Sequence, residues 1–181
     1  MIWGEAPTLT EEMMRNLNSK SRVSAGAEGA NLDSFDRAIL NVVQENNQLT
    51  SSEIGDRVGL SSTACLRRLS RLRQTGIIKA DVAIVDPAVG GARVTLIVQV
   101  SLEREQASLL EQFKKTMIAQ PEVVQCYYVT GAHDFVLIVN VRDMAGYDEF
   151  TQEHFFNNPN VRQFSTSVVM REVKFSTRIM L

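Results

Sequence analysis

The stretch LTSSEIGDRVGLSSTACLRRLSRLRQTGIIK, from Leu49 to Lys79, decides the fold of the first half of this chain. Thr50 and Glu53 have the spacing of a capping box, Gly59 is placed to end a short helix, and Ser61 is placed to cap the next one. The pattern predicts two short helices joined by a tight turn. The second helix has no acid between residues 61 and 73, and its arginines are Arg67, Arg68, Arg71 and Arg73.

A turn between two helices, with the second helix basic, is typical of a helix-turn-helix, whose later helix enters the major groove of DNA. Small polar residues and free N–H groups at the start of such a helix approach phosphates and bases closely. The alternative is an ordinary three-helix packing unit whose arginines form a solvated face. We favour the DNA-reading interpretation because we expect no acid to neutralise the arginines. The predicted contact residues are Ser61, Ser62, Thr63, Arg67, Arg68 and Arg71.

The overall composition does not by itself indicate a protein that binds nucleic acid. The 181 residues carry 19 Lys and Arg against 21 Asp and Glu, which gives a formal net charge of −2. The distribution of charge matters more than its sum, and the basic charge is concentrated in the second helix. With 44% apolar residues, the chain can build one large core or two small ones.

The sequence shows no pattern that indicates catalysis or membrane insertion. Cys65 and Cys126 are far apart in apolar surroundings, which predicts buried free thiols. With two histidines and no metal-ligand spacing, nucleophile set or phosphate loop, we predict no enzyme, no catalytic residue, no metal and no cofactor. Without a signal segment or a membrane-length apolar run, we expect a cytoplasmic, nucleoid-associated protein with no membrane partner.

The first part of the chain divides into three predicted segments. Residues 1–31 are weakly patterned and are expected to form a flexible tail, with a short amphipathic helix as the alternative. Residues 32–77 are expected to form the helix-turn-helix domain, whose first helix is capped by Asp33. Residues 78–91 are expected to form a connecting strand and linker, because apolar and polar residues alternate there before a Gly-Gly pair.

The second half, residues 92–181, repeats a strand, helix and strand rhythm twice. Predicted strands are 94–102, 123–130, 135–141 and 161–170, and predicted helices are 106–119 and 144–156. Two such units in tandem predict a ferredoxin-like βαββαβ domain with both helices on one face of an antiparallel sheet. The fold class is therefore α+β, and the other sheet face is expected to be apolar and to await a partner.

Several short strings resemble the leucine-responsive regulator family, also called Lrp/AsnC or feast/famine regulators. They are L-D-x-x-D-R-x-I-L, V-G-L-S, C-L-R-R-L-x-R-L and G-I-I in the first half, and Y-x-V-T-G-x-x-D and V-V-M-R-E-V-K in the second. The resemblance covers residues 32–181. It implies a winged helix-turn-helix that binds double-stranded DNA, joined to an amino-acid-sensing ferredoxin-like domain. It also implies a homodimer, formed through the sheet, that assembles into tetramers or octamers.

The string Val129–Asp134 joins two predicted strands, and taken alone it predicts a hairpin turn in which Asp134 bonds local backbone. The resemblance implies instead that an amino-acid effector meets this loop between subunits. The family's G-D-aromatic-D loop is here G-A-H-D, which reduces the charge available to an ammonium group. The effector residues that the resemblance implies are Tyr128, Thr130, Gly131, His133, Asp134, Met144, Ser167, Val168 and Val169.

These features lead to the hypothesis of a sequence-specific transcription regulator that responds to an amino acid. One alternative is a nucleoid-architectural DNA-binding protein without an effector. Another is a metabolic enzyme or its amino-acid-binding regulatory subunit, and the arginine helix argues against it.

Overall fold

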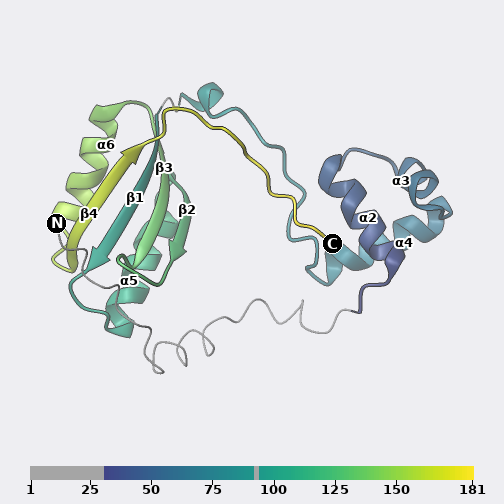
Figure 1. The fold of residues 1–181 in the computed structure, drawn as a ribbon, viewed down its shortest axis with the longest axis horizontal. Coiled ribbons are helices and arrows are strands. Elements are labelled where there is room, and N and C mark those ends of the chain that lie inside the picture. Colours follow the sequence, from purple (N-terminus) through teal and green to yellow (C-terminus); the bar gives the residue numbers. More distant parts are fainter. Residues whose placement is uncertain (1–30, 92–93) are drawn as a thin grey trace, which may run out of the picture. The chain divides into compact units, whose positions relative to one another are not determined.

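The computed structural model describes residues 31–91 and 94–181. The predicted tail, residues 1–31, lies outside the described residues except for Asn31. The described chain divides into a helical unit, made of the residues up to 83 together with 174–181, and a sheet unit made of residues 84–173 (Figure 1). We call them the head and the sheet unit.

The head contains the three predicted helices, α2 (Ser34–Glu45), α3 (Ser51–Val58) and α4 (Ser62–Gln74). Each begins at the predicted cap: the side chains of Asp33, Thr50 and Ser61 accept from a backbone N–H three residues on. The caps of α2 and α3 are complete capping boxes, so the positions where these helices begin are set locally. The buried apolar residues of the head are Ile39, Leu40, Ile54, Cys65, Leu69 and Leu72.

The turn between α3 and α4 depends on a close approach that only glycine permits. The backbone N–H of Leu60 donates to the carbonyl oxygen of Gly55 over 2.9 Å. A Cβ atom at Gly55 would lie 2.5 Å from the carbonyl oxygen of Leu60. Any side chain there would push the turn away from α3, so Gly55 sets the angle at which α4 leaves it.

The predicted connecting strand does not form. Residues 79–86 have no regular secondary structure, and a short 3₁₀ helix, η1 (Pro87–Gly90), follows them. A strand needs a neighbour to which its backbone groups can bond, and no strand of the described chain pairs with this segment. Val82 and Ile84 are 74% and 70% exposed, so their alternation buries nothing within one copy.

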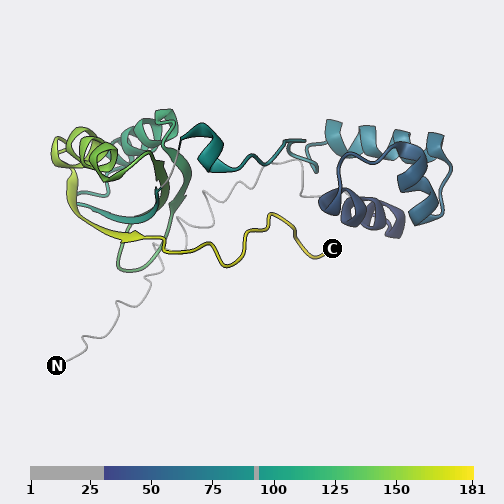
Figure 2. The ribbon, with the colours of Figure 1, turned by 90° about the horizontal axis from the view of Figure 1, so that it is seen from above.

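The sheet unit has the predicted βαββαβ order. Its elements are β1 (Val94–Leu102), α5 (Ala107–Ala119), β2 (Val123–Tyr128), β3 (Phe135–Val141), α6 (Met144–Thr151) with a π-helical extension η2 (Gln152–Phe156), and β4 (Val161–Val168). The strands lie in the order β2-β3-β1-β4 and every pair is antiparallel. Both helices cover the same face (Figure 2). The α+β, ferredoxin-like prediction is therefore confirmed.

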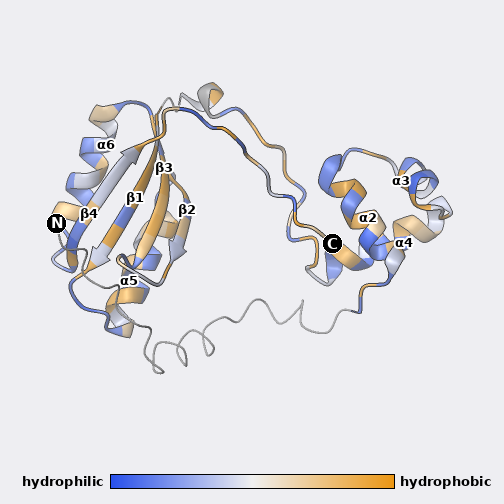
Figure 3. Ribbon diagram, in the orientation of Figure 1, coloured by the Kyte–Doolittle hydropathy of each residue, from blue (hydrophilic) through white to orange (hydrophobic). Residues whose placement is uncertain are grey.

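The uncovered sheet face is mixed rather than apolar, which corrects the prediction. Residues of β1 and β3 alternate between the helix-covered core and this face. In Figure 3, β3 is largely orange, whereas β4 is pale. The uncovered positions of the two central strands are Thr95, Ile97, Gln99, Val136, Ile138 and Asn140. The face thus has an aliphatic centre with polar residues around it, which is the usual make-up of a protein interface.

The last eight residues belong to the head, which the sequence did not predict. The side-chain amide of Gln44, on α2, accepts from the backbone N–H of Ile179 at 2.7 Å and donates to its carbonyl oxygen at 3.2 Å. Arg178 also pairs with Glu45 at 2.6 Å. The end of the chain is thereby attached to the first helix of the head.

Removal of residues 174–181 is expected to lower the free energy of unfolding of the head by about 1 kcal/mol, because each hydrogen bond contributes ~0.5–1.5 kcal/mol net and an exposed ion pair little. Chemical denaturation of the full and shortened chains measures the loss. Gln44→Ala should reproduce most of it. Gln48→Ala, a nearby control, should not, and full stability in both the shortened chain and Gln44→Ala would show that the attachment contributes nothing.

Candidate DNA-binding helix and effector site

One face of α4 points away from the core of the head. Cys65, Leu69 and Leu72 are buried, and an α-helix turns by about 100° per residue. On that geometry the stripe opposite the buried face contains Thr63, Arg67, Ser70 and, as the last residue of the helix, Gln74. We call the first three of these residues the outer stripe. Within the described residues, the Thr63 and Arg67 side chains have no hydrogen bond or ion pair, so both are available to a ligand.

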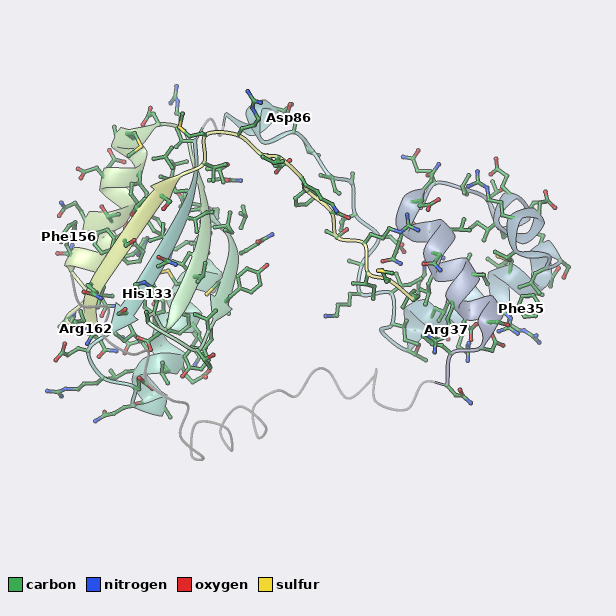
Figure 4. All side chains as sticks on the ribbon, viewed as in Figure 1. Phe35, Arg37, Asp86, His133, Phe156 and Arg162 are labelled. Carbon is green, nitrogen blue, oxygen red and sulfur yellow. The ribbon has the colours of Figure 1, made fainter. Side chains whose placement is uncertain are left out.

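Arg68 and Arg71 are held by acids at the start of α2. One terminal nitrogen of Arg68 donates to Asp33 at 2.7 Å and to Asp36 at 2.8 Å, and Arg71 donates to the second oxygen of Asp36. The guanidinium of Arg68 also lies 5.6 Å from the ring centre of Phe35, a residue labelled in Figure 4. The expectation that no acid neutralises these arginines was therefore wrong. The acids come from another helix, at the positions that cap it.

The ionic contacts set the charge states of this cluster. Burial alone would raise the pKa of Asp36, but hydrogen bonds from Arg71, Arg68 and the backbone at Asp33 bring its pKa below the ordinary value. Hydrogen bonds to Asp36 and Asp33 raise the pKa of Arg68. Arg73 pairs with Asp81 at 2.7 Å. Three of the four arginines of α4 thus have an acidic partner, and the free charge of the helix is carried by Arg67.

Acid is expected to destabilise the head by protonating Asp36. Because its folded pKa lies below its unfolded value, the Asp36 contacts stabilise fully above pH ~4 and are lost as the pH falls through the folded pKa. Thermal melts of the full chain between pH 7 and pH 3 test this. Below pH ~4 the melting temperature should fall more steeply for the native chain than for Asp36→Asn. If the melting temperatures of the two proteins fall in parallel with pH, Asp36 is not the group whose protonation destabilises the head.

The two predicted serines at the start of α4 have partners within the head. Ser61 Oγ accepts from the backbone N–H of Ala64 at 3.3 Å and so acts as the cap. The hydroxyls of Ser62 and Ser51 lie 2.8 Å apart and tie α4 to α3. Of the six predicted contact residues, Thr63 and Arg67 face outward, and the other four also serve the packing of the head. Ser70, which the sequence reasoning missed, completes the outer stripe.

The loop between β2 and β3 is closed by Asp134. Its Oδ2 accepts from the backbone N–H of Leu102 at 2.6 Å, and its backbone N–H donates to the carbonyl of Val100 at 2.9 Å. Gly131 has φ 127°, a backbone conformation that favours glycine and suits a turn. The backbone carbonyl of Asp134 accepts from the local N–H of Val129 at 2.9 Å, as the turn interpretation predicts, whereas its side chain bonds the end of the neighbouring strand β1. One of its carboxylate oxygens is therefore committed to the fold.

Three residues that the sequence reasoning missed, Ser101, Lys114 and Glu105, lie near predicted residues of the loop. His133 (Figure 4) has its Nδ1 3.1 Å from the hydroxyl of buried Ser101. The ammonium of Lys114, on α5, lies 5.1 Å from the ring centre of Tyr128. Burial raises the pKa of Tyr128, and the nearby carboxylates of Glu105 and Asp134 add to that rise. The loop therefore presents an ammonium, two carboxylates and an imidazole close together.

The remaining predicted effector residues lie at the other end of the sheet. Ser167 and Val168 pair with Ile97 and Leu96, and the N–H of Val169 donates to the carbonyl of Thr95 at 2.9 Å. Met144 begins α6 just after β3 ends opposite the start of β1. We call Tyr128, Thr130, Gly131, His133 and Asp134 the loop group. We call Met144, Ser167, Val168 and Val169 the strand-end group.

The distance between the loop group and the strand-end group decides whether both can contact one bound amino acid. The loop group is attached at Leu102 and the strand-end group at Leu96, and six residues of a strand span about 20 Å. A free amino acid is much shorter than that. One copy of the chain therefore cannot bring both groups to the same amino acid.

No cluster of three or more His, Cys, Asp or Glu side chains in residues 31–91 and 94–181 is arranged to hold a metal ion. None of the helices described is long and apolar enough to cross a bilayer.

Comparison with known proteins identifies relatives of both units. A winged helix-turn-helix DNA-binding family model matches residues 32–79, and the model of the Lrp/AsnC ligand binding domain matches residues 95–179. An uncharacterised HTH-type transcriptional regulator of Sinorhizobium fredii is 54% identical, over 79% of this chain and 85% of its own length. The leucine-responsive regulatory protein of Escherichia coli K12 is 35% identical over 84% of this chain and 93% of its own.

A solved structure agrees with the fold. The crystal structure of a transcriptional regulator from Neisseria meningitidis in complex with L-Met is 32% identical to this chain. It superimposes with a TM-score of 0.77 and covers 82% of this chain and 96% of its own. The order of helices and strands described above is therefore that of a known group of DNA-binding proteins.

Proposed function

The chain belongs to the Lrp/AsnC family of transcription regulators, and from that premise we propose that it binds specific DNA sequences and responds to an amino acid held between subunits. The family is not enzymatic, and the chain has both of its parts, a helix-turn-helix and a ligand-binding domain. The observation that carries the proposal is the separation of the loop group from the strand-end group. If both groups contact the effector, the site is complete only when two copies meet.

DNA binding is assigned to the outer stripe of α4. Thr63 and Arg67 are exposed, and Arg67 is the arginine of this helix without an acidic partner among the described residues. An arginine in the major groove can bind guanine through two hydrogen bonds or contact a phosphate. With so little free charge on one head, useful affinity requires several heads held together.

Assembly is assigned to the sheet unit. Its uncovered face has Ile97, Val136 and Ile138 at the centre and polar groups around them, as an interface between two copies requires. We propose a homodimer through this face that assembles further into a tetramer or octamer. A regulator of this kind acts in the cytoplasm, associated with the nucleoid, and needs no cofactor other than its effector.

The effector is proposed to be a free amino acid. The related Neisseria protein forms a complex with L-Met. In this chain the ammonium of Lys114 lies beside the loop and is paired with Glu111 at 2.8 Å, so an effector carboxylate would share it with that ion pair. Asp134 Oδ1 and Glu105 could accept from an ammonium group. An effector that binds one assembly better than another shifts the balance between them by its difference in affinity.

The hydrogen bond between the Asp134 carboxylate and Leu102 favours a second candidate function, that of a DNA-binding protein without an effector. One of its oxygens is used by Leu102, and the G-A-H-D loop supplies no second carboxylate. A chain with no effector would act as an architectural DNA-binding protein with little sequence preference.

Selection of DNA from a random duplex pool separates these two functions. The full chain is incubated with the pool, and the affinity for the selected duplex is compared with that for sheared genomic DNA at a fixed salt concentration. A regulator should prefer the selected duplex by roughly 10³-fold or more. A ratio near one would contradict the sequence-specific function and favour the architectural one.

A further inference from the structure

We propose that Asp36 is a positioning residue that fixes the rotation of α4 and so decides which arginines of that helix reach DNA. The inference rests on the proposed function, in that α4 must be the DNA-reading helix. It goes further because Asp36 lies on α2 and touches no DNA itself. Asp36 is predicted to control both the specificity of binding and the strength of non-specific binding.

The contacts form one closed network between two helices. The carboxylates of Asp33 and Asp36 each accept from the other's backbone N–H, at 2.8 and 3.2 Å, and so cap α2. Each carboxylate also accepts from Arg68, and Asp36 accepts from Arg71 as well. The cap of one helix thus serves as the docking point of the other.

Burial makes this network hard to leave unpaired. The side chain of Asp36 is 1% exposed, whereas those of Arg68 and Arg71 are 24% and 49% exposed. A buried carboxylate without its cations is strongly unfavourable. The two arginines, being closer to water, are the mobile partners, and Asp36 is the fixed one.

Attachment at two points resists rotation of α4 about its axis. Arg68 and Arg71 are three residues apart, so they lie on the same side of the helix one turn from each other. Both reach the same carboxylate. The outer stripe of Thr63, Arg67 and Ser70 is thereby held at a fixed angle to the head.

The same contacts limit binding to phosphate. A guanidinium that is already paired with a carboxylate gains less from a phosphate than a free one does. Freed from Asp36, Arg68 and Arg71 would add sequence-independent contacts to any duplex. By holding Arg68 and Arg71, Asp36 therefore lowers the affinity for non-specific DNA and keeps the ratio of specific to non-specific affinity high.

Asp36→Asn in the full chain tests the inference, because it keeps the size of the side chain and removes its charge. The probes are the duplex selected by the native chain and sheared genomic DNA, each measured over a range of salt concentrations. We expect the affinity ratio between them to fall at least tenfold. The salt dependence of genomic DNA binding should become steeper by up to ~1.8 per head, at ~0.9 for each phosphate newly contacted.

Asp56→Asn is the matched control, since Asp56 is an exposed acid of α3 in the same head. It makes the same change in charge and should leave the affinity ratio within about twofold. An equal effect of both variants would show that only net charge matters and would overturn the proposal. Adding Arg68→Gln and Arg71→Gln to Asp36→Asn should return the salt dependence to the native slope.

A second variant keeps the test decisive if Asp36→Asn fails to fold. Arg68→Lys with Arg71→Lys preserves every charge but replaces the terminal guanidinium nitrogens that reach the carboxylates with ammonium groups on a shorter side chain. Its affinity ratio should also fall, and circular dichroism reports whether the head is folded. If every folded variant keeps the native ratio of affinity for the selected duplex to affinity for genomic DNA, the proposed role of Asp36 is wrong. Failure of the native chain to select any duplex would instead overturn the proposed function.

Discussion

Replacing Arg67 with Ala is expected to weaken binding to the selected duplex by ~5- to 150-fold per head, the range for loss of an arginine that contacts a base. The melting temperature should stay within about 2 °C of the native value, because Arg67 is exposed and its side chain makes no hydrogen bond or ion pair among the described residues. Fluorescence anisotropy at fixed salt and thermal melting measure the two quantities.

Arg71→Ala provides the contrast, because it leaves Asp36 with only Arg68 as a cationic partner. It should lower the melting temperature as well as DNA affinity. Lys115→Ala, an exposed cation on α5 of the sheet unit, controls for the change in net charge. If Arg67→Ala binds like the native chain, or if Arg71→Ala alone loses affinity without loss of stability, the assignment of the outer stripe is wrong.

Two variants that each fail to bind the effector are expected to regain part of the effector binding when they are mixed. Asp134→Asn removes the charge of the loop group while its amide oxygen can still accept from Leu102. Met144→Glu alters the strand-end group at the first turn of α6, where an acidic residue suits the helix. Each variant alone should bind no effector. If one copy supplies each group, random mixing leaves about one quarter of the sites with both groups native.

Isothermal titration measures this restoration directly as the number of sites per chain. The variants are unfolded together, refolded at equal amounts and titrated with the amino acid that shifts the native protein most. Each variant refolded alone is the control. No recovered sites in the mixture would contradict a site shared between copies.

The elements whose signals are local were predicted from the sequence closely. The limits of β1 and β3 coincide with the predicted ranges 94–102 and 135–141, because apolar runs bounded by turns define a buried strand. The caps at Asp33 and Ser61 were predicted for a similar reason, since a capping residue acts within one turn. The strand predicted between residues 78 and 84 does not form. Alternating apolar and polar residues indicate that a segment can pair as a strand, but they do not show whether a neighbouring strand is present.

The candidate sites depended on contacts that a sequence does not display. Arg68 was predicted to be free because the acids that hold it, Asp33 and Asp36, lie more than thirty residues away, at the start of another helix. The docking of Ile179 on Gln44 joins residues still further apart. The loop group and the strand-end group were predicted together as one effector site. Only the strand register shows that they lie at opposite ends of β1.

The central claim is that an amino acid changes how this regulator binds DNA, and one titration tests it. The selected duplex, labelled with a fluorophore, is titrated with the full chain at fixed salt in the presence of each of the twenty amino acids in turn. At least one amino acid should change the apparent affinity or the cooperativity of binding about fivefold or more. Tight, specific binding that none of the twenty amino acids alters would contradict the claim.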